Sequence, residues 1–597
     1  MDQMKNLIEL FYDQVLKKGD APFLWSKKES TWQSITWEEA AKRVASLADK
    51  LKTLGVTPGD RVGLVSESRP EWPIADLAIM AVGGITVPAY VTNSISDHKY
   101  ILEDSQAIGV IVSSTNLAEN VLPAAEKVAS LKFAISFDQK LEVQTDRISL
   151  HSLDTIVNSC TDTAAILDNA AESISRDETA CLIYTSGTGG TPKGVMLSHG
   201  AILCNCIGSN ELLQEMGLGD EVFLSFLPLS HSYEHTAGQF FPIMIGAQIY
   251  YAEGIDKLAQ NMEEVHPTLM TAVPRLYEVM HDRIRKGVKQ AGGISEKLFN
   301  KTIHLGRKKY EKPASLSLSE NLQNAVLDKL VRSKVKGRFG GQLKALVSGG
   351  APLNYDIGIF FTALGIKLLQ GYGQTESAPV ISCNPPSDNR IDTVGKPMKG
   401  VDCQIANDGE IIVKGELVMQ GYWNNPEATR EAIKDGWLHT GDIGEFDGDG
   451  YLKITDRKKD IIVNSGGDNI SPQRIEGMLT TQPEIGQAMV YGDRRPHLTA
   501  LIIPDAEYAA AWAKENGHSK TNLEFVVERP DFKKVMVKAV DRVSNNLSGI
   551  EKVRRFTLSH EAFTIDNEML TPTLKIRRHI IREKFFEKLE ALYGSQT

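Results

Sequence analysis

A short stretch of glycines, hydroxyl side chains and one lysine is the part of the chain best suited to hold phosphate. It reads Tyr184-Thr-Ser-Gly-Thr-Gly-Gly-Thr-Pro-Lys-Gly194 and lies between the apolar run 180–183 and a helix that we expect from Gly200. Glycines let backbone N–H groups approach an anion, and hydroxyl and ammonium groups complete such a cradle. This is not a Walker A loop, because no Ser or Thr follows Lys193. A flexible linker is the alternative, but linkers rarely end in Pro-Lys-Gly.

Four more short motifs that could take part in the same chemistry follow along the chain. They are Gly371-Tyr-Gly-Gln-Thr-Glu-Ser377, Gly436-Trp-Leu-His-Thr-Gly-Asp442, Asp456-Arg-Lys-Lys-Asp460 with Asn464-Ser-Gly-Gly-Asp-Asn-Ile-Ser471, and Leu570-Thr-Pro-Thr-Leu-Lys575. In this order the blocks and the loop resemble the adenylate-forming (AMP-binding) superfamily of acyl-CoA synthetases, peptide-synthetase adenylation domains and luciferases. The resemblance covers roughly residues 35 to 580, nearly the whole chain.

The resemblance implies a role for each block. The first loop would hold the phosphates of ATP, the second block the adenine and magnesium, and the third block the ribose. Glu376 would bind Mg²⁺, Lys575 and His231 would be catalytic, and Lys459 would be a hinge. The implied ATP- and AMP-binding residues are Thr185, Ser186, Gly187, Thr188, Gly189, Lys193, Gly349, Gly350, Ala351, Tyr372, Gly373, Thr375, Asp442 and Arg457.

Several of these side chains also have a purely structural interpretation. Glu376 could cap a turn, and Tyr372 could be a buried core tyrosine rather than a platform for adenine. Asp442 and Arg457 could form a surface salt bridge rather than bind ribose and phosphate. His231 could be a core histidine. The ordered co-occurrence of the blocks favours the functional interpretation.

The chemistry that this set of residues suits is the activation of a carboxylate. A carboxylate is a poor electrophile, and its attack on the α-phosphorus of ATP brings negative charges together, so catalysis consists of positioning and charge neutralisation. Magnesium bridging phosphate oxygens needs few protein ligands. Lys575 follows a polar, turn-like segment, from which a flexible ammonium can reach the forming bond. Many relatives have Gly before this lysine; here it is Leu574, as in the long-chain branch.

Two features of the sequence restrict the kind of acid that the protein could activate: the lack of an aspartate in one block, and a long segment that follows it. Peptide-synthetase domains bind an amino acid's ammonium with an aspartate, but no Asp occurs between Asp220 and Asp256, although Glu234 could replace it. Residues 253–275 and the long helical stretch to about residue 340 resemble long-chain fatty acid–CoA ligases. Each buried CH₂ of such an acid contributes about 0.8 kcal/mol to binding.

The sequence leaves more than one acceptor open for the acyl group in the second half-reaction. CoA is the acceptor that the resemblance favours. A fatty acyl-AMP ligase would stop at the adenylate or pass it to a carrier protein, and an acyl-carrier-protein synthetase would use phosphopantetheine. Such ligases carry an insertion just after the hinge, and Asp460 runs here straight into Ile461. A non-catalytic nucleotide-binding regulator is disfavoured, because Lys575 and Glu376 are both present.

The pattern of apolar residues between the motifs predicts a layered α/β architecture, which would hold the motifs in position. Residues 37–51 have the apolar spacing of a helix, whereas 60–65 and 109–112 are typical of buried strands between helices. Such alternation predicts largely parallel sheets. Residues 275–340 are charged and helix-prone, and we interpret them as a solvated helical face.

The domain organisation follows from a change in the sequence pattern near Gly409, where short strand-like runs replace the alternation of strands and amphipathic helices. Short strands with Gly and Asp turns predict a β-rich subdomain at about 400–458. We predict a large N-terminal AMP-binding domain at 1–458 and a small, mobile α+β C-terminal domain at 459–597, which carries the catalytic lysine and ends in a basic helix from Arg577 to about Leu592.

From composition and cysteine usage we expect a cytoplasmic protein. The chain has 597 residues and a formal net charge of −10, which argues against a broad nucleic-acid surface. No apolar run approaches the roughly 18 residues of a spanning helix, and the N-terminus lacks signal-peptide features. We interpret the six cysteines as reduced thiols. The sequence leaves the oligomeric state and the preferred acyl chain length open.

A loose contact with the inner face of a membrane is a further expectation, because fatty acids partition into bilayers. Two basic regions are candidates, namely residues 332–338 and the terminal helix. The net charge of −10 opposes such a contact. We therefore expect weak, salt-sensitive association at most. The basic residues of the terminal region are Lys575, Arg577, Arg578, Arg582, Lys584 and Lys588.

Overall fold

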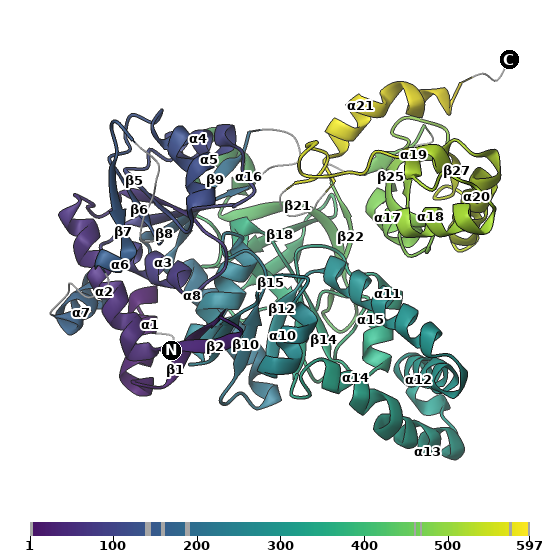
Figure 1. Ribbon diagram of the computed structural model, residues 1–597, viewed down its shortest axis with the longest axis horizontal. Coiled ribbons are helices and arrows are strands. Elements are labelled where there is room, and N and C mark those ends of the chain that lie inside the picture. The colour runs from purple at the N-terminus through teal and green to yellow at the C-terminus, as the bar shows by residue number, and fades with distance from the viewer. Residues whose placement is uncertain are drawn as a thin grey trace.

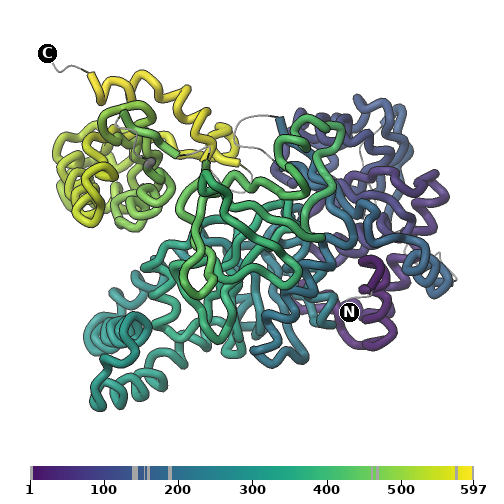
Figure 2. The backbone as a smooth tube through the Cα atoms, turned by 180° about the vertical axis from the view of Figure 1, so that it is seen from behind, coloured from purple at the N-terminus to yellow at the C-terminus, as the bar shows by residue number. Residues whose placement is uncertain are grey.

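The computed structural model describes residues 4–137, 145–156, 162–185, 191–458, 461–465, 469–571 and 576–594. A large α/β body contains two extended sheets and a smaller β-rich sheet, and a C-terminal unit lies beside it (Figure 1). Seen from behind, the β-rich segment lies at the centre, against both the N-terminal and the middle parts of the chain (Figure 2). The layered α/β fold predicted from the sequence is confirmed.

The first extended sheet has eight strands in the order β19-β9-β8-β4-β3-β5-β6-β7. Most neighbours are parallel, but β9 runs antiparallel to β8, and β19 runs antiparallel to β9. The strands predicted at 60–65 and 109–112 are β3 and β5. The members are β3 (Arg61–Val65), β4 (Ile85–Ala89), β5 (Gly109–Val112), β6 (Phe133–Ser136), β7 (Ser149–Ser152), β8 (Thr179–Thr185), β9 (Lys193–Ser198) and β19 (Gly421–Tyr422).

Both faces of this sheet are covered, because side chains alternate along its strands. In β5, Ile111 belongs to a core that includes α1, α2, α3, α7 and α8, whereas Val110 and Val112 pack with α4 and α5 on the other face. A run of apolar residues buried on both sides is typical of parallel strands. The helices are α1 (Leu7–Lys18), α2 (Trp37–Thr53), α3 (Glu71–Ala81), α4 (Ile95–Asp104), α5 (Thr115–Ala125), α6 (Leu153–Ile156), α7 (Thr163–Ser173) and α8 (His199–Leu213).

The second extended sheet has nine strands in the order β16-β15-β14-β13-β12-β10-β11-β1-β2. Its core and that of the first sheet form one buried cluster, which places α8 and α9 between the sheets. The strands are β1 (Pro22–Lys28), β2 (Thr31–Thr36), β10 (Val222–Ser225), β11 (Gln248–Tyr251), β12 (Leu269–Ala272), β13 (Ala345–Ser348), β14 (Leu368–Gly373), β15 (Val380–Cys383) and β16 (Lys396–Pro397). The short helices of this region are η1 (Gln214–Met216), the π-helix η2 (Glu234–Phe240), α9 (Phe241–Met244), α10 (Leu258–Val265) and η5 (Thr375–Ser377).

A helical lobe covers the far face of the second sheet and projects beyond it (Figure 1). It confirms the helical character predicted for residues 275–340. Buried Phe299, Leu305 and Leu327 pack there with Phe360 and Phe361. The elements are α11 (Pro274–Ala291), α12 (Gly293–Glu311), η3 (Pro313–Ser315), α13 (Leu318–Leu327), the π-helix η4 (Asp328–Arg332), α14 (Ser333–Arg338) and α15 (Tyr355–Ala363).

The β-rich unit and the C-terminal unit complete the fold. The β-rich sheet has the order β17-β18-β21-β20, with β22 paired to β21, and the C-terminal sheet has the order β25-β26-β27. The β-rich members are β17 (Asp402–Ile405), β18 (Glu410–Lys414), β20 (Ile433–Lys434), β21 (Trp437–Phe446) and β22 (Leu452–Arg457), with α16 (Pro426–Ala432). The C-terminal members are β23 (Ile462–Val463), β24 (Asn469–Ile470), α17 (Pro472–Leu479), β25 (Ile485–Tyr491), β26 (Leu498–Pro504), α18 (Ala506–Glu515), α19 (Leu523–Val527), α20 (Pro530–Ser544), β27 (Val553–Leu558) and α21 (Arg578–Ala591).

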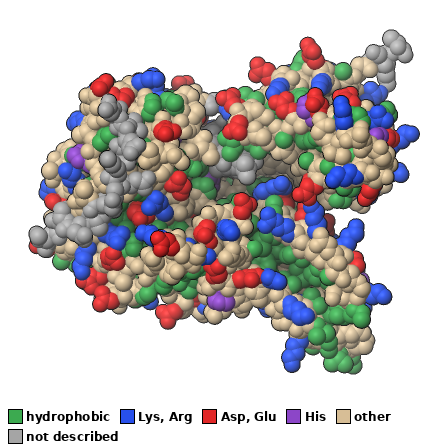
Figure 3. Space-filling view, in the orientation of Figure 1, with side chains coloured by type: hydrophobic (Ala, Val, Ile, Leu, Met, Phe, Trp, Pro, Cys, Tyr) green, Lys and Arg blue, Asp and Glu red, His purple; other side chains and the backbone are tan. Residues whose placement is uncertain are grey.

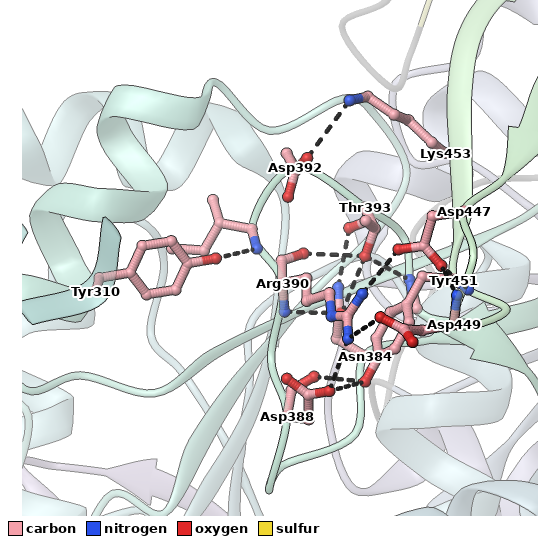
Figure 4. Close-up of polar contacts among 12 residues, drawn as sticks. Tyr310, Asn384, Asp388, Arg390, Asp392, Thr393, Asp447, Asp449, Tyr451 and Lys453 are labelled. Carbon is pink, nitrogen blue, oxygen red and sulfur yellow. Dashed lines mark hydrogen bonds and ion pairs between the residues drawn. The ribbon is translucent and has the colours of Figure 1, made fainter. Parts of the chain in front are cut away.

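A polar network anchors the β-rich hairpin to the body of the molecule (Figure 4). The Arg390 guanidinium donates to Asp388, Asp447 and Asp449, and it lies over the ring of Tyr451 at 4.0 Å. The hydroxyl of Tyr451 donates to Asp388. Because Asp447 and Tyr451 form the turn between β21 and β22, this network holds the hairpin whose other end carries Asp442 and Arg457.

Two expectations about membranes and thiols can be compared with the structure. Within the described ranges no helix is both long and apolar enough to cross a bilayer. The five cysteines that the structure describes are free. The expectation that 332–338 is a basic surface is wrong for Arg332, which is buried and binds Asp328 and the carbonyl oxygen of Ala363.

Candidate functional site

The glycine-rich loop follows β8 and precedes β9, two antiparallel strands near the end of the first sheet where β19 is outermost. Thr185 pairs with Lys193 across this hairpin, so both ends of the loop are fixed by the β8–β9 register. Ser186, Gly187, Thr188 and Gly189 lie outside the described residues. The hairpin thus places the Lys193 ammonium at the base of the loop, where it lies 4.9 Å from the centroid of the Tyr422 ring.

Tyr422 connects this hairpin to Glu376. The residue reaches the site because β19 pairs with β9, with Tyr422 opposite Val195. Its hydroxyl donates to Glu376 Oε1 at 2.8 Å. Burial and the Glu376 charge raise the pKa of Tyr422, so the hydroxyl stays protonated and remains a donor.

Glu376 is not the cap of its own turn. The short helix η5 is capped by Gln374 and Ser377, whose side chain accepts the Gln374 N–H at 3.2 Å. Within the described residues, Glu376 forms no ion pair and its carboxylate is held by Tyr422. A half-buried carboxylate, oriented by a neutral donor rather than neutralised by a cation, fits the ligand that Mg²⁺ takes when it bridges phosphates.

Asp442, Arg457 and Tyr372 form a second group, contributed by β21, β22 and β14. Asp442 lies opposite Arg457 in the β21–β22 register, and Asp442 Oδ1 is 3.3 Å from Arg457 Nε. The Tyr372 hydroxyl donates to Asp442 Oδ2 at 2.7 Å. The ion pair that the structural interpretation expected is therefore present, and it orients the carboxylate that the functional interpretation assigns to ribose.

The ring of Tyr372 is part of the buried core, which agrees with the alternative that this residue is a core tyrosine. Burial, together with the Asp442 charge, raises the pKa of Tyr372, so it is a lasting donor to Asp442. Stacking of this ring on adenine stays a prediction.

His231 lies in the segment that leads into the π-helix η2. Its Nδ1 accepts the N–H of Tyr233 at 3.1 Å, which leaves the proton of a neutral ring on Nε2. The neighbouring Ser232 hydroxyl lies 3.1 Å from Thr375 Oγ1. The structure therefore brings the histidine segment next to the block that contains Glu376.

Two of the glycines that the resemblance assigns to nucleotide binding are required by packing against other residues of the protein. A Cβ on Gly349 would lie 2.9 Å from the Tyr233 ring, and one on Gly373 would lie 1.8 Å from the carbonyl oxygen of Pro379. Gly350 has φ = +82°, a conformation that favours glycine. Ala351 follows at an exposed position. Packing inside the protein therefore accounts for glycine at 349 and 373, and contact of this segment with adenine stays a prediction.

Glu234 is a functional candidate that the motifs did not single out for this site. It is fully buried at the start of η2, and it accepts hydrogen bonds from Ser225 at 2.6 Å and Thr271 at 2.5 Å. Burial raises its pKa to about 7, although both hydroxyls oppose the shift. Because Ser225 and Thr271 lie at the C-terminal ends of parallel strands, Glu234 ties the His231 segment to the sheet edge where α/β proteins bind ligands.

Tyr422 was also missed, and nothing in its local sequence could have revealed it. Its position depends on pairing between β19 and β9, which lie more than two hundred residues apart. Lys575 and Lys459 lie outside the described residues, so their placement stays a prediction.

The fold and this grouping define an α/β enzyme class in which a glycine-rich hairpin, a held carboxylate and an Asp–Arg pair converge. The chain belongs to the AMP-binding enzyme family: the model of that family matches residues 11–423, and the model of its C-terminal domain matches residues 459–597.

Curated relatives extend over almost the whole chain. It is 34% identical to long-chain-fatty-acid–CoA ligase FadD15 of Mycobacterium bovis, over 95% of this chain and 94% of the relative. It is 30% identical to long-chain-fatty-acid–CoA ligase 1 of Cavia porcellus, over 100% of this chain and 87% of the relative. The adenylation domain of a carboxylate reductase from Mycobacterium chelonae has the same fold, with a TM-score of 0.74, 22% identity, and coverage of 99% and 91% of the two chains.

Proposed function

We propose that the protein is a long-chain fatty acid–CoA ligase. In the first half-reaction the carboxylate attacks the α-phosphorus of ATP, which gives acyl-AMP and releases pyrophosphate. In the second, the CoA thiolate attacks the acyl carbonyl carbon, the bond to AMP breaks, and a thioester forms. The observation that carries this proposal is that Tyr422 joins the Lys193 hairpin to Glu376, while Tyr372, four residues before Glu376, holds Asp442 of the Asp442–Arg457 pair.

The described residues fit the charges of the first half-reaction. We assign the Lys193 ammonium to the phosphates and Asp442 to the ribose hydroxyls, with Arg457 reaching ribose and phosphate. Glu376 would hold a magnesium ion bound with ATP, and that ion would neutralise phosphate charge. Tyr422 and Tyr372 each orient one of these carboxylates, so both are positioned before substrate binds.

The acyl side of the site is proposed from the His231 segment and the relatives. His231 borders the block with Thr375, where the carboxylate must meet the nucleotide. The relatives' names support a long-chain fatty acid as the substrate. A bound hydrocarbon tail gains about 0.8 kcal/mol for each buried CH₂.

The domain boundary is proposed at Lys458–Lys459. Lys458 is tied to the β-rich unit through Asp408 and Glu410, at 2.7 and 3.1 Å, and through its N–H to the Gly441 carbonyl. The chain after it enters a unit with its own sheet and its own core. A hinge immediately after a fixed residue can rotate that unit as one body.

CoA and carrier-bound phosphopantetheine remain distinguishable by experiment. A panel of carboxylates in ATP–pyrophosphate exchange identifies the acid, and thioester formation is then measured with CoA and with acyl carrier protein. We expect exchange to be greatest with long-chain fatty acids and thioester only with CoA. Exchange without either thioester would support a fatty acyl-AMP ligase, and nucleotide binding without exchange would support a regulator.

We further propose a cytoplasmic location with loose membrane contact. A reducing compartment keeps thiols free, and it supplies ATP and CoA. Sedimentation of cell fractions at low and high salt tests this proposal: transfer of the protein from the membrane to the soluble fraction by salt is expected, and retention at high salt would contradict it.

A further inference from the structure

Helix α13 and the π-helix η4 that continues it present a row of large apolar side chains to solvent. Leu318, Leu322 and Val326 follow one another at four-residue spacing, and their exposed fractions are 91%, 70% and 50%. Leu330 follows with 47%. Residues four apart lie on one face of a helix, so these four residues form a continuous strip, called here the leucine ridge.

The ridge is not the face by which the helix is held. Leu327 and Val331 point the other way and are buried in the core of the helical lobe. The N-terminus of α13 is closed by a capping box between Ser317 and Glu320, and Glu320 also binds Lys308 of α12. The helix is therefore capped and packed on one face, and its second apolar face is surplus to the fold.

The charge of the lobe differs sharply from that of the rest of the chain. Residues 274–338 contain 16 Lys and Arg against 6 Asp and Glu, a formal charge of +10, whereas the whole chain carries −10. Several of the lobe's carboxylates are already in ion pairs with basic residues. Figure 3 shows hydrophobic, Lys and Arg side chains together over the lobe where Figure 1 places α12 and α13.

Two lysines border the ridge. Lys329 precedes Leu330 in the chain and Lys334 lies one turn further, and both are exposed. Neither forms an ion pair with any residue that the structure describes. An apolar strip beside basic residues is the pattern of helices that lie in the interface of an anionic bilayer.

We propose that the leucine ridge, with Lys329 and Lys334, is a docking surface for a bilayer that contains anionic lipid. A second copy of this chain would bring a lobe of +10 against another of +10, which opposes self-association through this face. Nucleic acid would use the lysines but not the leucines. The purpose of this surface rests on the proposed function: it would bring the enzyme to the bilayer, in which long-chain acids dissolve.

Co-sedimentation of the full-length protein tests the surface. Vesicles of phosphatidylglycerol with phosphatidylcholine are compared with vesicles of phosphatidylcholine alone. We expect binding to the anionic vesicles, and a drop of about tenfold in the partition coefficient for the double variant Leu318→Asn/Leu322→Asn. The double variant Lys329→Gln/Lys334→Gln should bind anionic vesicles more weakly, and its remaining binding should be less sensitive to salt.

Matched controls separate the ridge from general surface effects. Leu16→Asn removes another leucine that is 69% exposed, on α1, and Lys514→Gln/Lys520→Gln removes two exposed lysines of the C-terminal unit. The controls should bind as the unaltered protein does. Equal binding by the ridge variant, no binding by the unaltered protein, or a change of oligomeric state in the ridge variant by analytical ultracentrifugation would each overturn the proposal.

Activity assays distinguish failure of this surface from failure of the proposed function. With a water-soluble medium-chain acid, the ridge variant should match the unaltered protein in pyrophosphate exchange. With a long-chain acid presented in anionic vesicles, the ridge variant should be slower. If no carboxylate supports exchange but vesicle binding still depends on the ridge, the proposed function fails and the docking surface stands.

Discussion

At the scale of single residues, the site depends on carboxylates that other side chains hold in place. Tyr422 holds Glu376, and Tyr372 with Arg457 holds Asp442. Glu234 shows the opposite situation, since it is a buried carboxyl that accepts hydrogen bonds from the hydroxyls of Ser225 and Thr271.

Removal of the Tyr422 hydroxyl should weaken the use of MgATP. In Tyr422→Phe the ring remains, but Glu376 loses its hydrogen-bond donor. Because a hydrogen bond to a charged group is worth about 1.5–3 kcal/mol, kcat/KM for MgATP should fall about tenfold. The Mg²⁺ concentration that gives the highest activity should rise. Tyr12→Phe, on the distant helix α1, is the control. An unchanged magnesium titration would argue against Glu376 as the metal ligand.

Substitution of Lys575 should separate the two half-reactions. We expect Lys575→Ala to slow adenylation by about 10²-fold or more, because the ammonium is needed while charge builds at the α-phosphate. Thioester formation from supplied acyl-AMP should be almost unchanged, and Lys588→Ala on α21 should leave both steps intact. Equal losses in both steps would make the lysine structural.

Glu234 should make stability depend on pH in an unusual direction. Its folded pKa, about 7, is above the unfolded value of about 4.5, so its contribution is fully present at pH 4.5 and is lost as the pH rises through 7. The free energy of unfolding of Glu234→Gln, relative to that of the unaltered protein, should therefore increase between pH 5 and pH 7.5, by about 1.4 kcal/mol per unit of pKa shift at most.

Urea unfolding at several pH values gives the measurement. Glu524→Gln, which alters an exposed carboxyl of α19, should show no such trend. A constant difference between the Glu234 variant and the unaltered protein from pH 5 to 7.5 would show that Glu234 keeps an ordinary pKa.

At the scale of elements, the site is assembled by strand pairing between distant segments. β19 carries Tyr422 to the glycine-rich hairpin, and the β21–β22 hairpin carries Asp442 opposite Arg457. The far end of that hairpin is fixed by Arg390 (Figure 4). Hydrogen bonds from Tyr451 and ion pairs with Arg390 lower the pKa of both Asp388 and Asp447.

Loss of Arg390 should therefore destabilise the hairpin in a pH-dependent way. We expect Arg390→Gln to lower the urea midpoint at pH 7 and pH 5. The difference should shrink below about pH 4, because lowered carboxyl pKa values stabilise only above the unfolded pKa and lose their effect as the pH falls through the folded one. Lys434→Gln, in the same sheet, is the control. A difference that is the same at pH 7 and pH 3.5 would mean that Arg390 acts through packing on Tyr451.

Periodicity and local motifs predicted the elements better than their pairing. The helix expected at 37–51 is α2, and the strand expected at 109–112 is β5, because spacing within one segment reports the face that it buries. The blocks around Glu376 and Asp442 were found because glycines and charged residues there are contiguous in sequence. Tyr422 acts through Glu376, and Arg390 reaches the hairpin through Asp447 and Asp449; these partners are more than forty residues away, and no single-segment pattern contains them.

At the scale of the whole molecule, one contact between the C-terminal unit and the large body is suited to rearrangement. Lys286 of α11 forms an ion pair with Glu507 of α18 at 2.6 Å, and both side chains are exposed. Exposed ion pairs contribute about 0–1 kcal/mol. This contact can therefore form in one orientation of the unit and break in another at little cost.

Stiffening of the proposed hinge should affect the second half-reaction more than the first. Lys459→Pro fixes φ near −65°, so pyrophosphate exchange should remain measurable while CoA transfer slows strongly. Lys459→Ala keeps the backbone free and serves as the matched control. If transfer is as fast in the proline variant as in the alanine variant, rotation does not occur about this residue.

The π-helix η2 has a consequence for how this protein tolerates changes in chain length. A π-helical turn is an α-helical turn with an additional residue, and Gly238 lies within it, where a Cβ would be 2.4 Å from the Glu234 carboxyl carbon. Deletion of Gly238 would allow ordinary α-helical bonding, yet it would rotate everything on one side of the deletion by about 100°. Insertions and deletions at this point should therefore be far more harmful than their small effect on helix bonding suggests, whereas the loop around Gly217, where a Cβ would meet no atom within 4 Å, has room for them.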